Sequence, residues 1–328
     1  MKRLPGLNVF TSTPSHGRSS GHTLVPQNDS TIRPSGPSIS VIIPAFNCEA
    51  VLPNAIESAL TQTFPPAEVA VVDDGSTDKT FEIASGYRAP VRALRKTNGG
   101  PASARNAGVR VTTGEWVAFL DADDIWFPQK LARQTQLIED DVAVVCSRAH
   151  GAPIEMPAVI TFEELWRGNF IVNSSTLVRR QAFTELGGLD EDPKLIGVED
   201  YNLWFRVLAA GWRIVGADEE LCSYDRRSTS LSRQTLRFAA SALANIEKLA
   251  TQLRLDPSLV RRKEATTYED FAAVLFSARD MVNARKFLRE SLRRSFGLKR
   301  LGRLALTYTP KTLLGLQRTL RAHWNAAG

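Results

Sequence analysis

Three acidic residues follow directly on a short apolar run near the middle of the chain. The run Trp116–Leu120 is typical of a buried strand, and Asp121, Asp123 and Asp124 come immediately after it. Carboxylates crowded at the end of a buried strand repel one another and lose hydration. Mg²⁺ or Mn²⁺, which prefers hard oxygen ligands, relieves both costs. The alternative is a solvated loop in which one aspartate caps the helix that follows.

The sequence before this run alternates between short β-branched segments and segments with helical spacing. We expect strands at 39–43, 68–72, 91–94 and 115–120, and helices at 49–62, 77–85 and 101–110. This alternation predicts an α/β fold with a mainly parallel sheet flanked by helices. Polar segments end three of the strands, at 44–47, 73–76 and 121–124. Because ligands of such sheets bind beyond the carboxyl ends of the strands, we expect these segments to converge on one cleft.

The second half of the sequence is less regular. We expect strands at 142–146, 174–179, 214–216 and 221–224, and a helix over 198–210. Glu199 and Asp200 fall in the first turn of that helix, where the helix dipole favours anions. From Leu236 onward the pattern predicts helices almost throughout, with breaks near Pro257, Gly297–Leu298 and Pro310.

Composition and charge divide the chain of 328 residues into three parts. Residues 1–37 are rich in Ser, Thr, Pro and Gly without periodicity, which predicts a disordered arm. Residues 38–232 form the predicted α/β domain. Residues 233–328 carry 19 Lys and Arg against 7 Asp and Glu, a net of +12, whereas residues 1–232 carry 22 against 28, a net of −6. The basic helical region is therefore expected to face something anionic.

Several classes of protein are disfavoured by what the sequence lacks. No apolar run approaches the roughly 18 residues that span a bilayer, and the N-terminus has no apolar signal-peptide core. The cysteines Cys48, Cys146 and Cys222 are odd in number and widely spaced, which suits a reducing cytosol. We therefore expect a cytoplasmic protein, with peripheral attachment to the cytoplasmic face of the membrane as an open alternative. The four histidines do not cluster, so a zinc site has little support.

The polar segments at the predicted cleft have the chemistry of a nucleoside diphosphate site. Asp74 can accept hydrogen bonds from a base or from sugar hydroxyls, and Phe46 offers a face for stacking. Asp123, with Asp121, can hold a cation that bridges two phosphates. Neither a G-x-x-x-x-G-K-[ST] loop nor a G-x-G-x-x-G after the first strand is present. This argues against P-loop NTPases and dinucleotide oxidoreductases.

Four motifs in series carry a family resemblance. Val41–Asn47 reads VIIPAFN, Val71–Asp78 reads VVDDGSTD, Asn98–Asn106 reads NGGPASARN, and Leu120–Asp124 reads LDADD. In order and spacing they resemble the family 2 glycosyltransferases over roughly residues 39–232. The resemblance implies the GT-A fold, a nucleotide-sugar donor, a divalent metal (Mn²⁺ or Mg²⁺) at the acidic DxD motif, and inversion at the anomeric carbon.

The resemblance also implies roles for individual residues. Asp200, in a segment that resembles the Glu-Asp motif of the family, would be the general base that takes the proton of the acceptor hydroxyl. Asp123 would bind the metal. Arg105 would either contact the donor or pair with an acid as a structural residue. The remaining residues predicted to bind the donor are Pro44, Ala45, Phe46, Asn47 and Glu49 around the base and ribose, Asp74 at the base, Asn98 at the border of the pocket, and Asp121 at the ribose or donor sugar.

Two departures from the family pattern matter. Many relatives carry a histidine shortly after the last strand, and here Arg227 stands at that position. Arginine does not ligate metals but pairs with phosphate, so we expect Arg227 to contact the diphosphate. The chain also lacks a Gln-x-x-Arg-Trp motif and membrane spans, which processive polysaccharide synthases usually have. A non-processive hexosyl- or similar transferase that adds one sugar per encounter is the expectation.

The predicted function is transfer of one sugar, from a UDP-sugar first of all, to a hydroxyl of a cell-surface glycan, lipid-linked acceptor or polysaccharide precursor of the cell envelope. One alternative is an inactive module that only binds sugar nucleotides. A sugar nucleotidyltransferase is the other, but residues 44–49 lack the glycines and cations with which such enzymes handle a triphosphate.

The basic region leaves three interpretations open. Apolar residues at helical spacing are accompanied by Lys286, Arg289, Arg293, Arg294, Lys299, Arg300 and Arg303. This pattern fits a solvated bundle that packs on the catalytic domain, or peripheral contact with an anionic membrane. Nucleic-acid binding is the least supported because no recognised binding motif accompanies the charge.

Overall fold

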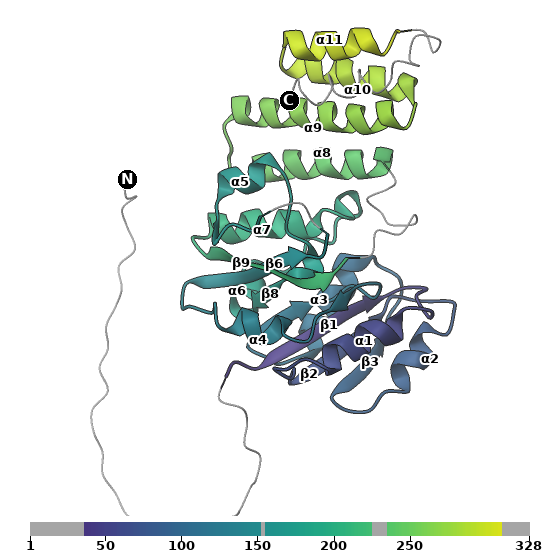
Figure 1. The fold of residues 1–328 in the computed structure, drawn as a ribbon, viewed down its shortest axis with the longest axis vertical. Helices are drawn as coiled ribbons and strands as arrows, with labels where there is room; N and C mark the ends of the chain where they lie inside the picture. Colours follow the sequence, from purple (N-terminus) through teal and green to yellow (C-terminus); the bar gives the residue numbers. More distant parts are fainter. Residues whose placement is uncertain (1–35, 152–154, 225–234, 310–328) are drawn as a thin grey trace, which may run out of the picture. The chain divides into compact units, whose positions relative to one another are not determined.

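The sheet is built around its first strand. The computed structural model describes residues 36–151, 155–224 and 235–309. Within them, nine strands form one sheet in the order β3-β2-β1-β4-β8-β6-β9-β5, and β7 also pairs with β9 (Figure 1). The strands are β1 (Ile39–Ala45), β2 (Glu68–Asp73), β3 (Val91–Arg95), β4 (Trp116–Phe119), β5 (Ile125–Trp126), β6 (Val142–Ala149), β7 (Val159–Ile160), β8 (Leu177–Arg179) and β9 (Arg213–Ser223).

The described chain has helices on both faces of this sheet and a further group of helices in its C-terminal region. They are α1 (Leu52–Leu60), α2 (Thr80–Ser85), α3 (Pro101–Val111), α4 (Lys130–Thr135), α5 (Phe162–Arg167), α6 (Arg180–Glu185), α7 (Glu199–Ala209), α8 (Thr235–Gln252), α9 (Pro257–Ser277), α10 (Met281–Arg294) and α11 (Leu298–Leu306). Two short 3₁₀ turns, Asn173–Ser175 and Pro193–Leu195, complete the described elements.

The sheet is mixed and mainly parallel, as predicted. β1 pairs in parallel with β2 on one side and with β4 on the other, and β2 pairs in parallel with β3. The antiparallel pairings are short ones that involve β5, β7 and β8. The chain crosses from β3 to the far side of β1 when it forms β4. In open α/β sheets a ligand crevice lies at such a reversal of strand order, beyond the carboxyl ends of the strands.

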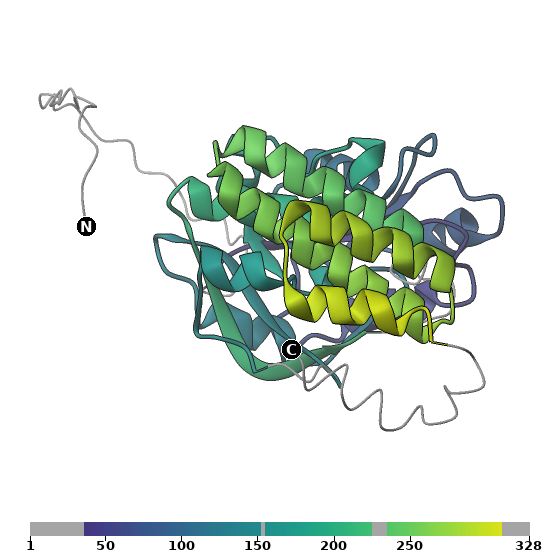
Figure 2. The same ribbon diagram turned by 90° about the horizontal axis from the view of Figure 1, so that it is seen from above.

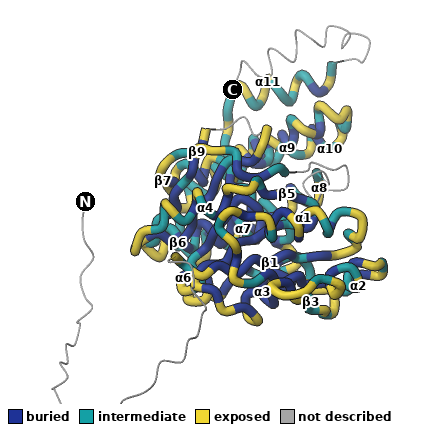
Figure 3. The backbone as a smooth tube through the Cα atoms, turned by 60° about the horizontal axis from the view of Figure 1, so that its bottom comes forward, coloured by how far each residue is buried: buried dark blue, intermediate teal, exposed yellow. Residues whose placement is uncertain are grey.

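Alternation along β1 divides the core into two layers. Ile39, Val41 and Ile43 belong to one buried cluster, which also contains Leu52 and Ile56 of α1. Ile42 points the other way, into the cluster formed with α3, α6 and α7. Gly108 permits the close approach of α3, because a Cβ there would collide with Ile42. Figure 3 shows the resulting dark, buried interior of β1.

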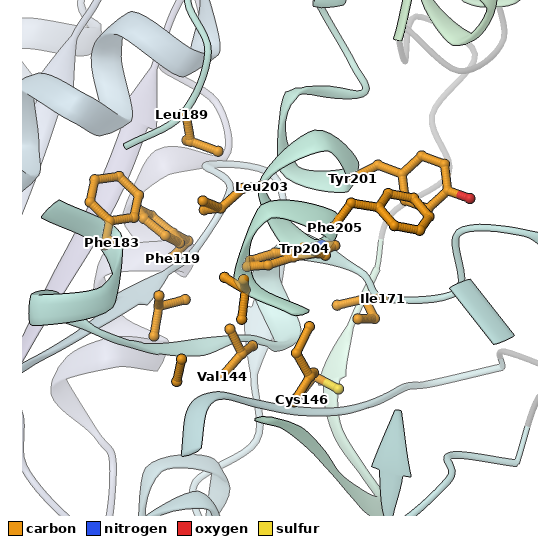
Figure 4. Close-up of a cluster of buried hydrophobic side chains, with 14 of the residues drawn as sticks. Phe119, Val144, Cys146, Ile171, Phe183, Leu189, Tyr201, Leu203, Trp204 and Phe205 are labelled. Carbon is orange, nitrogen blue, oxygen red and sulfur yellow. The ribbon is translucent and has the colours of Figure 1, made fainter. Parts of the chain in front are cut away.

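The helix that carries Glu199 and Asp200 is anchored in the second core layer. Leu203, Trp204 and Phe205 of α7 are fully buried. Figure 4 shows Leu203 on the side of Phe119, at the end of β4, and Phe183 of α6, whereas Phe205 lies on the other side next to Tyr201. Phe119 and Phe183 themselves contact with ring centroids 5.8 Å apart. Apolar packing of this kind fixes the first turn of α7 relative to the end of β4.

The structure changes several predicted boundaries. β1 continues through Pro44 to Ala45 because its pairing with β2 extends to Ala45–Asp73, while its pairing with β4 stops at Ile42–Phe119. Pro44 has no N–H to donate, so it is tolerated where only one neighbour remains. The strands expected at 214–216 and 221–224 are one strand, β9, whose pairing with β6 is interrupted by register shifts. The predicted strand at 174–179 begins as a 3₁₀ turn.

The C-terminal helices stack one on another above α7. Figure 1 shows α8 next to α7, followed in order by α9, α10 and α11, and Figure 2 shows the green and yellow C-terminal helices lying over the rest of the domain. Buried Asn202 of α7 donates to Asn245 of α8 at 2.8 Å. Residues from Gly36 onward form a single compact unit, so the helical region is docked on the sheet domain. Part of the predicted basic face is internal, since Arg294 pairs with Glu264, and both Arg300 and Arg303 pair with Glu269. Among the described residues, no helix is long and apolar enough to cross a membrane.

Candidate functional site

The three acids after β4 have three different environments. Asp124 is 1% exposed and accepts from the hydroxyl of Ser174 at 2.5 Å. Asp121 is partly exposed, and its backbone N–H donates to the same hydroxyl at 3.0 Å. Asp123 is also partly exposed. The Ser174 hydroxyl therefore bonds to two residues of the loop 121–124 and holds it in place. Asp121 and Asp123 of this loop remain partly exposed to solvent.

Arg105 joins the end of β4 to the start of α7. Its guanidinium group is buried on α3 and pairs with Asp121 at 2.6 Å and with Glu199 at 2.7 Å. These two acids keep the pKa of Arg105 well above its ordinary value, although burial of the group opposes them. Of the two roles left open for Arg105, the geometry supports the structural one, because both terminal nitrogens are occupied by ion pairs.

Asp200 stands next to Glu199 in the first turn of α7. It keeps some solvent exposure, and its carboxylate accepts from the N–H of Tyr201 at 2.6 Å. Burial, followed by repulsion from Glu199, raises the pKa of Asp200 to about 7, and Arg105 opposes this shift. A carboxylate with a pKa near neutrality is suited to accept a proton and release it again.

Asp74 organises the segment that precedes α3. Its buried carboxylate accepts from Lys96 Nζ at 2.6 Å, from the N–H of Gly99 at 3.0 Å and from the N–H of Gly100 at 2.7 Å. Asn98 donates from its side chain to the backbone carbonyl of Asp74 at 2.9 Å. Gly75 has a φ of +81°, and a Cβ there would lie 3.0 Å from the backbone nitrogen of Asn98. The sequence alone indicated no partner for Asp74, whereas in the structure three groups of the protein donate hydrogen bonds to its carboxylate.

The loop after β1 is tied to the loop after β2. The Asn47 side chain accepts from the N–H of Thr77 at 2.9 Å, and Glu49 accepts from the N–H of Lys79 at 2.9 Å. Phe46 is left 52% exposed. Burial raises the pKa of Cys48 to about 11, and the carboxylates of Asp78 and Asp123 add to the shift. Because β1 and β4 pair in parallel, the loops that follow them leave the sheet at the same edge.

The acids that follow β4 fit a magnesium or manganese ion that takes its other ligands from substrate phosphates and water. In the part of the chain that the structure describes, no group of three or more histidine, cysteine or acidic side chains is arranged so that it could hold a metal ion by itself. Mg²⁺ is commonly held by one or two carboxylates, with substrate phosphates and water as its other ligands. Asp123, a partly exposed hard oxygen donor beside Asp121, matches that arrangement.

The structure brings most of the predicted residues to one edge of the sheet, but not all of them can be placed. Pro44 and Ala45 end β1, and Phe46, Asn47 and Glu49 follow it. Asp74 follows β2, and Arg105 connects Asp121 to the helix of Asp200. Arg227 lies outside the described residues. A separate cavity of about 660 Å³ borders α3, α6 and residues 186–191, and none of the predicted site residues lines it.

Sequence reasoning missed Lys96 and Ser174 and gave Glu199 no role beyond the helix terminus. Lys96 follows directly on β3, so the rule that strand ends carry the site could have singled it out. Ser174 lies in the polar run 173–176, which is buried in the structure. A polar run inside a predicted strand is the sequence feature that could have pointed to Ser174.

Comparisons with known proteins agree with this geometry. The model of glycosyl transferase family 2 matches residues 40–184. An uncharacterized glycosyltransferase of Rickettsia typhi is 33% identical over 189 residues, which are 52% of this chain and 59% of that protein. The Escherichia coli protein WfaP, named as a UDP-Glc:alpha-D-GlcNAc-diphosphoundecaprenol beta-1,3-glucosyltransferase, is 30% identical over 53% of this chain and 71% of its own length.

Solved structures show the same fold at low identity. The mannosyltransferase PcManGT of Pyrobaculum calidifontis, in complex with GDP-Man and Mn²⁺, matches with a TM-score of 0.61 at 19% identity, over 89% of this chain and 84% of that one. TarS 1-349 of S. aureus, in complex with UDP-GlcNAc, matches with a TM-score of 0.59 at 18% identity, over 86% of this chain and 92% of that one. The predicted GT-A fold is confirmed. With the four motifs, the sheet topology and these relatives in agreement, the chain belongs to glycosyl transferase family 2.

Proposed function

We propose that the protein moves one sugar from a nucleoside diphosphate sugar to a hydroxyl acceptor, with inversion at the anomeric carbon. The observation that carries the proposal is the buried bridge from Asp121 through Arg105 to Glu199, the neighbour of Asp200. This bridge links the edge proposed for the donor to the helix proposed for the base. Binding of a donor alone would not need that connection.

Asp200 is the proposed general base. As a carboxylate it takes the proton of the acceptor hydroxyl while that oxygen attacks the anomeric carbon. The bond from the anomeric carbon to the diphosphate oxygen breaks with its electron pair, and the nucleoside diphosphate leaves. One displacement of this kind inverts the anomeric centre and needs no covalent intermediate. The pKa near 7 leaves a substantial fraction of Asp200 ionised at neutral pH.

The donor is proposed to lie across the ends of β1, β2 and β4. Exposed Phe46 supplies a stacking face for the base, and the loop held by Asp74 borders the base and ribose. Asp121 faces the ribose or sugar, and Arg227 contacts the diphosphate. A divalent cation at Asp123 would offset the charge that grows on the departing diphosphate.

The donor is proposed to be a UDP-sugar, and the acceptor a lipid-linked or glycan precursor of the cell envelope. The solved complex of TarS with UDP-GlcNAc and the name of WfaP, which specifies UDP-Glc and a diphosphoundecaprenol-linked sugar, support this choice. The GDP-Man complex of PcManGT makes GDP-sugars the second group to test.

Transfer assays on the purified chain test the proposal. UDP-, dTDP- and GDP-sugars with Mn²⁺ are paired with polyprenyl-diphosphate-linked sugars and with free glycans, and the configuration of each product is determined by NMR. We expect an inverted product from at least one UDP-sugar, and loss of transfer without loss of donor binding in Asp200→Asn. Donor binding with no transfer across the panel would leave only the binding module. A product that retains configuration would reject the single displacement.

A further inference from the structure

The last described helix exposes its apolar side. Leu298 is 78% exposed and Leu301 is 45% exposed, and Tyr308, just beyond α11, is 51% exposed. Ala305, which is also exposed, falls between them at helical spacing, so these side chains share one face of the helix. Phe296, in the turn before α11, is 72% exposed. Figure 3 marks exposed residues of α11 in yellow.

The opposite side of α11 makes the polar contacts with the protein. Arg300 pairs with Glu269 of α9 at 2.8 Å, and Arg303 pairs with the same carboxylate. Arg285 of α10 donates to the backbone carbonyl of Thr307 at 2.6 Å. A helix on the surface of a water-soluble domain normally turns its apolar side inward. In α11, Arg300 and Arg303 are turned inward while Leu298 and Leu301 are turned outward, and the ion pairs with Glu269 hold the helix in this orientation.

Positive charge surrounds the exposed apolar side chains. Lys299 is exposed three residues after Phe296, and Lys286 and Arg289 are exposed on α10. Arg293, three residues before Phe296, is 73% exposed although it pairs with Glu290. Over the described residues from Ser291 to Thr309 the sequence has five lysine and arginine residues and no aspartate or glutamate. A second copy of the chain would bring like charges together on this face, which opposes self-association.

We propose that this surface, formed by Phe296, Leu298, Leu301 and Tyr308 with Lys299 and Arg293, binds an anionic lipid membrane. An amphipathic surface that combines large apolar side chains with lysine and arginine lies in the headgroup region of a bilayer, and anionic lipids strengthen its binding. The protein would attach through the helices farthest from the sheet, as Figure 1 shows their order. The proposal does not depend on the proposed function, because no donor or acceptor is involved in lipid binding.

Vesicle flotation of the full chain tests the proposal. We expect the protein to float with vesicles of phosphatidylcholine and phosphatidylglycerol, and at least about tenfold less with phosphatidylcholine alone, since about 1 kcal/mol per nearby cation is at stake. Leu301→Glu should reduce flotation at least about tenfold. Val159→Glu is its matched control, because Val159 is 46% exposed on β7, away from α11, and Leu301 is 45% exposed. This control should float like the parent.

Several outcomes would overturn the proposal. They are failure of the full chain to float, equal flotation with and without phosphatidylglycerol, or equal losses in Leu301→Glu and Val159→Glu. A lipid-free dimer that Leu301→Glu dissociates would assign the face to a second copy. Flotation only after removal of residues 310–328 would mean that this segment covers the face. If Leu301→Glu fails to fold by circular dichroism, Lys299→Glu replaces it, and unchanged flotation of that variant also rejects the proposal.

Discussion

Arg105 and Glu199 form a buried ion pair between residues 94 positions apart in the sequence, with 2.7 Å between Nη1 and Oε1. Their side chains are 6% and 5% exposed. The second arm of Arg105 pairs with Asp121 at 2.6 Å. The pair thereby fixes the distance between the acids after β4 and the first turn of α7, on which the proposed chemistry depends.

Removal of one partner of this pair should be strongly destabilising. Arg105→Met leaves the carboxylate of Glu199 buried without its cation, and such losses cost about 3–5 kcal/mol. The double variant Arg105→Met/Glu199→Met should recover much of that stability, because no buried charge remains unpaired. Urea unfolding of the parent, both single variants and the double variant measures the coupling. Additive single and double effects would show that the pair is not coupled.

The rate of transfer should depend on the ionisation of Asp200. Because the base must be deprotonated, we expect kcat/KM to rise about tenfold per pH unit below pH 7 and to level off above it. Asp200→Asn should lower kcat by about 10²–10⁴, with the donor Kd nearly unchanged. Rate profiles between pH 5 and about 9 test this expectation. If Asp200→Asn keeps both the fall of kcat/KM at low pH and the kcat of the parent, another residue must be the general base.

The same pKa shift has a consequence for stability. The pKa of Asp200 in the folded protein, about 7, lies above the roughly 3.9 of an unfolded aspartate, so the folded state holds the proton more tightly. The free energy of unfolding should therefore fall as the pH rises from about 4 to about 7 and show no further loss from this group above that. Asp200→Asn should be more stable than the parent at pH 8 and show a smaller decline. Thermal melts without metal or donor measure this difference.

Metal removal should abolish transfer, and Asp123 should be responsible for the requirement. We expect EDTA to stop the reaction and Mn²⁺ or Mg²⁺ to restore it, because the diphosphate needs a counter-charge. Asp123→Ala should lose the metal-dependent part of the rise in Tm that UDP produces. Asp140→Ala, at an exposed acid before β6, is the control and should behave like the parent. Full Mn²⁺ dependence in Asp123→Ala would remove this residue from the metal site.

Asp74 should affect the donor through the loop that it holds. Asp74→Asn removes a charge that accepts from Lys96, Gly99 and Gly100, and charge-assisted hydrogen bonds contribute about 1.5–3 kcal/mol each. We expect a lower Tm and a donor KM that rises more than kcat falls. Asp218→Asn, at a 56% exposed side chain paired with Arg148, is the matched control. A normal Tm and donor KM in Asp74→Asn would contradict both roles.

Lys130 should make stability depend on pH above neutrality. Its buried ammonium bonds to Gln134 at 2.6 Å and lies 4.1 Å from the ring centre of Trp126, and burial lowers its pKa to about 7. An unfolded lysine stays protonated to about pH 10.4, so the unfolded state binds more protons between these values. The free energy of unfolding should then rise with pH over that window. Lys130→Met should flatten this rise in urea titrations, whereas Lys299→Met at an exposed position should not.

Prediction from sequence succeeded where the signal was local and failed where it was not. The first four strands were expected because each is a short segment rich in apolar residues, and the helices between them because their apolar residues recur at helical spacing. β5 and β7 have two residues each and exist only because β9 lies alongside them. The continuity of β9 across residues 217–220 depends in the same way on the pairing of β6. Such pairings join distant segments, and no local pattern encodes them.

The sequence by itself determined which residue types end each strand, and with them the family and the edge of the sheet where we propose the site. The tertiary structure decided which charges meet there. Arg105 pairs with Asp121 and Glu199, the Asp74 carboxylate is engaged by the loop before α3, and Asp200 has a pKa near 7. It also decided that α11 turns arginines inward and leucines outward. Contacts and desolvation depend on distances between segments far apart in the chain, which a residue pattern does not contain.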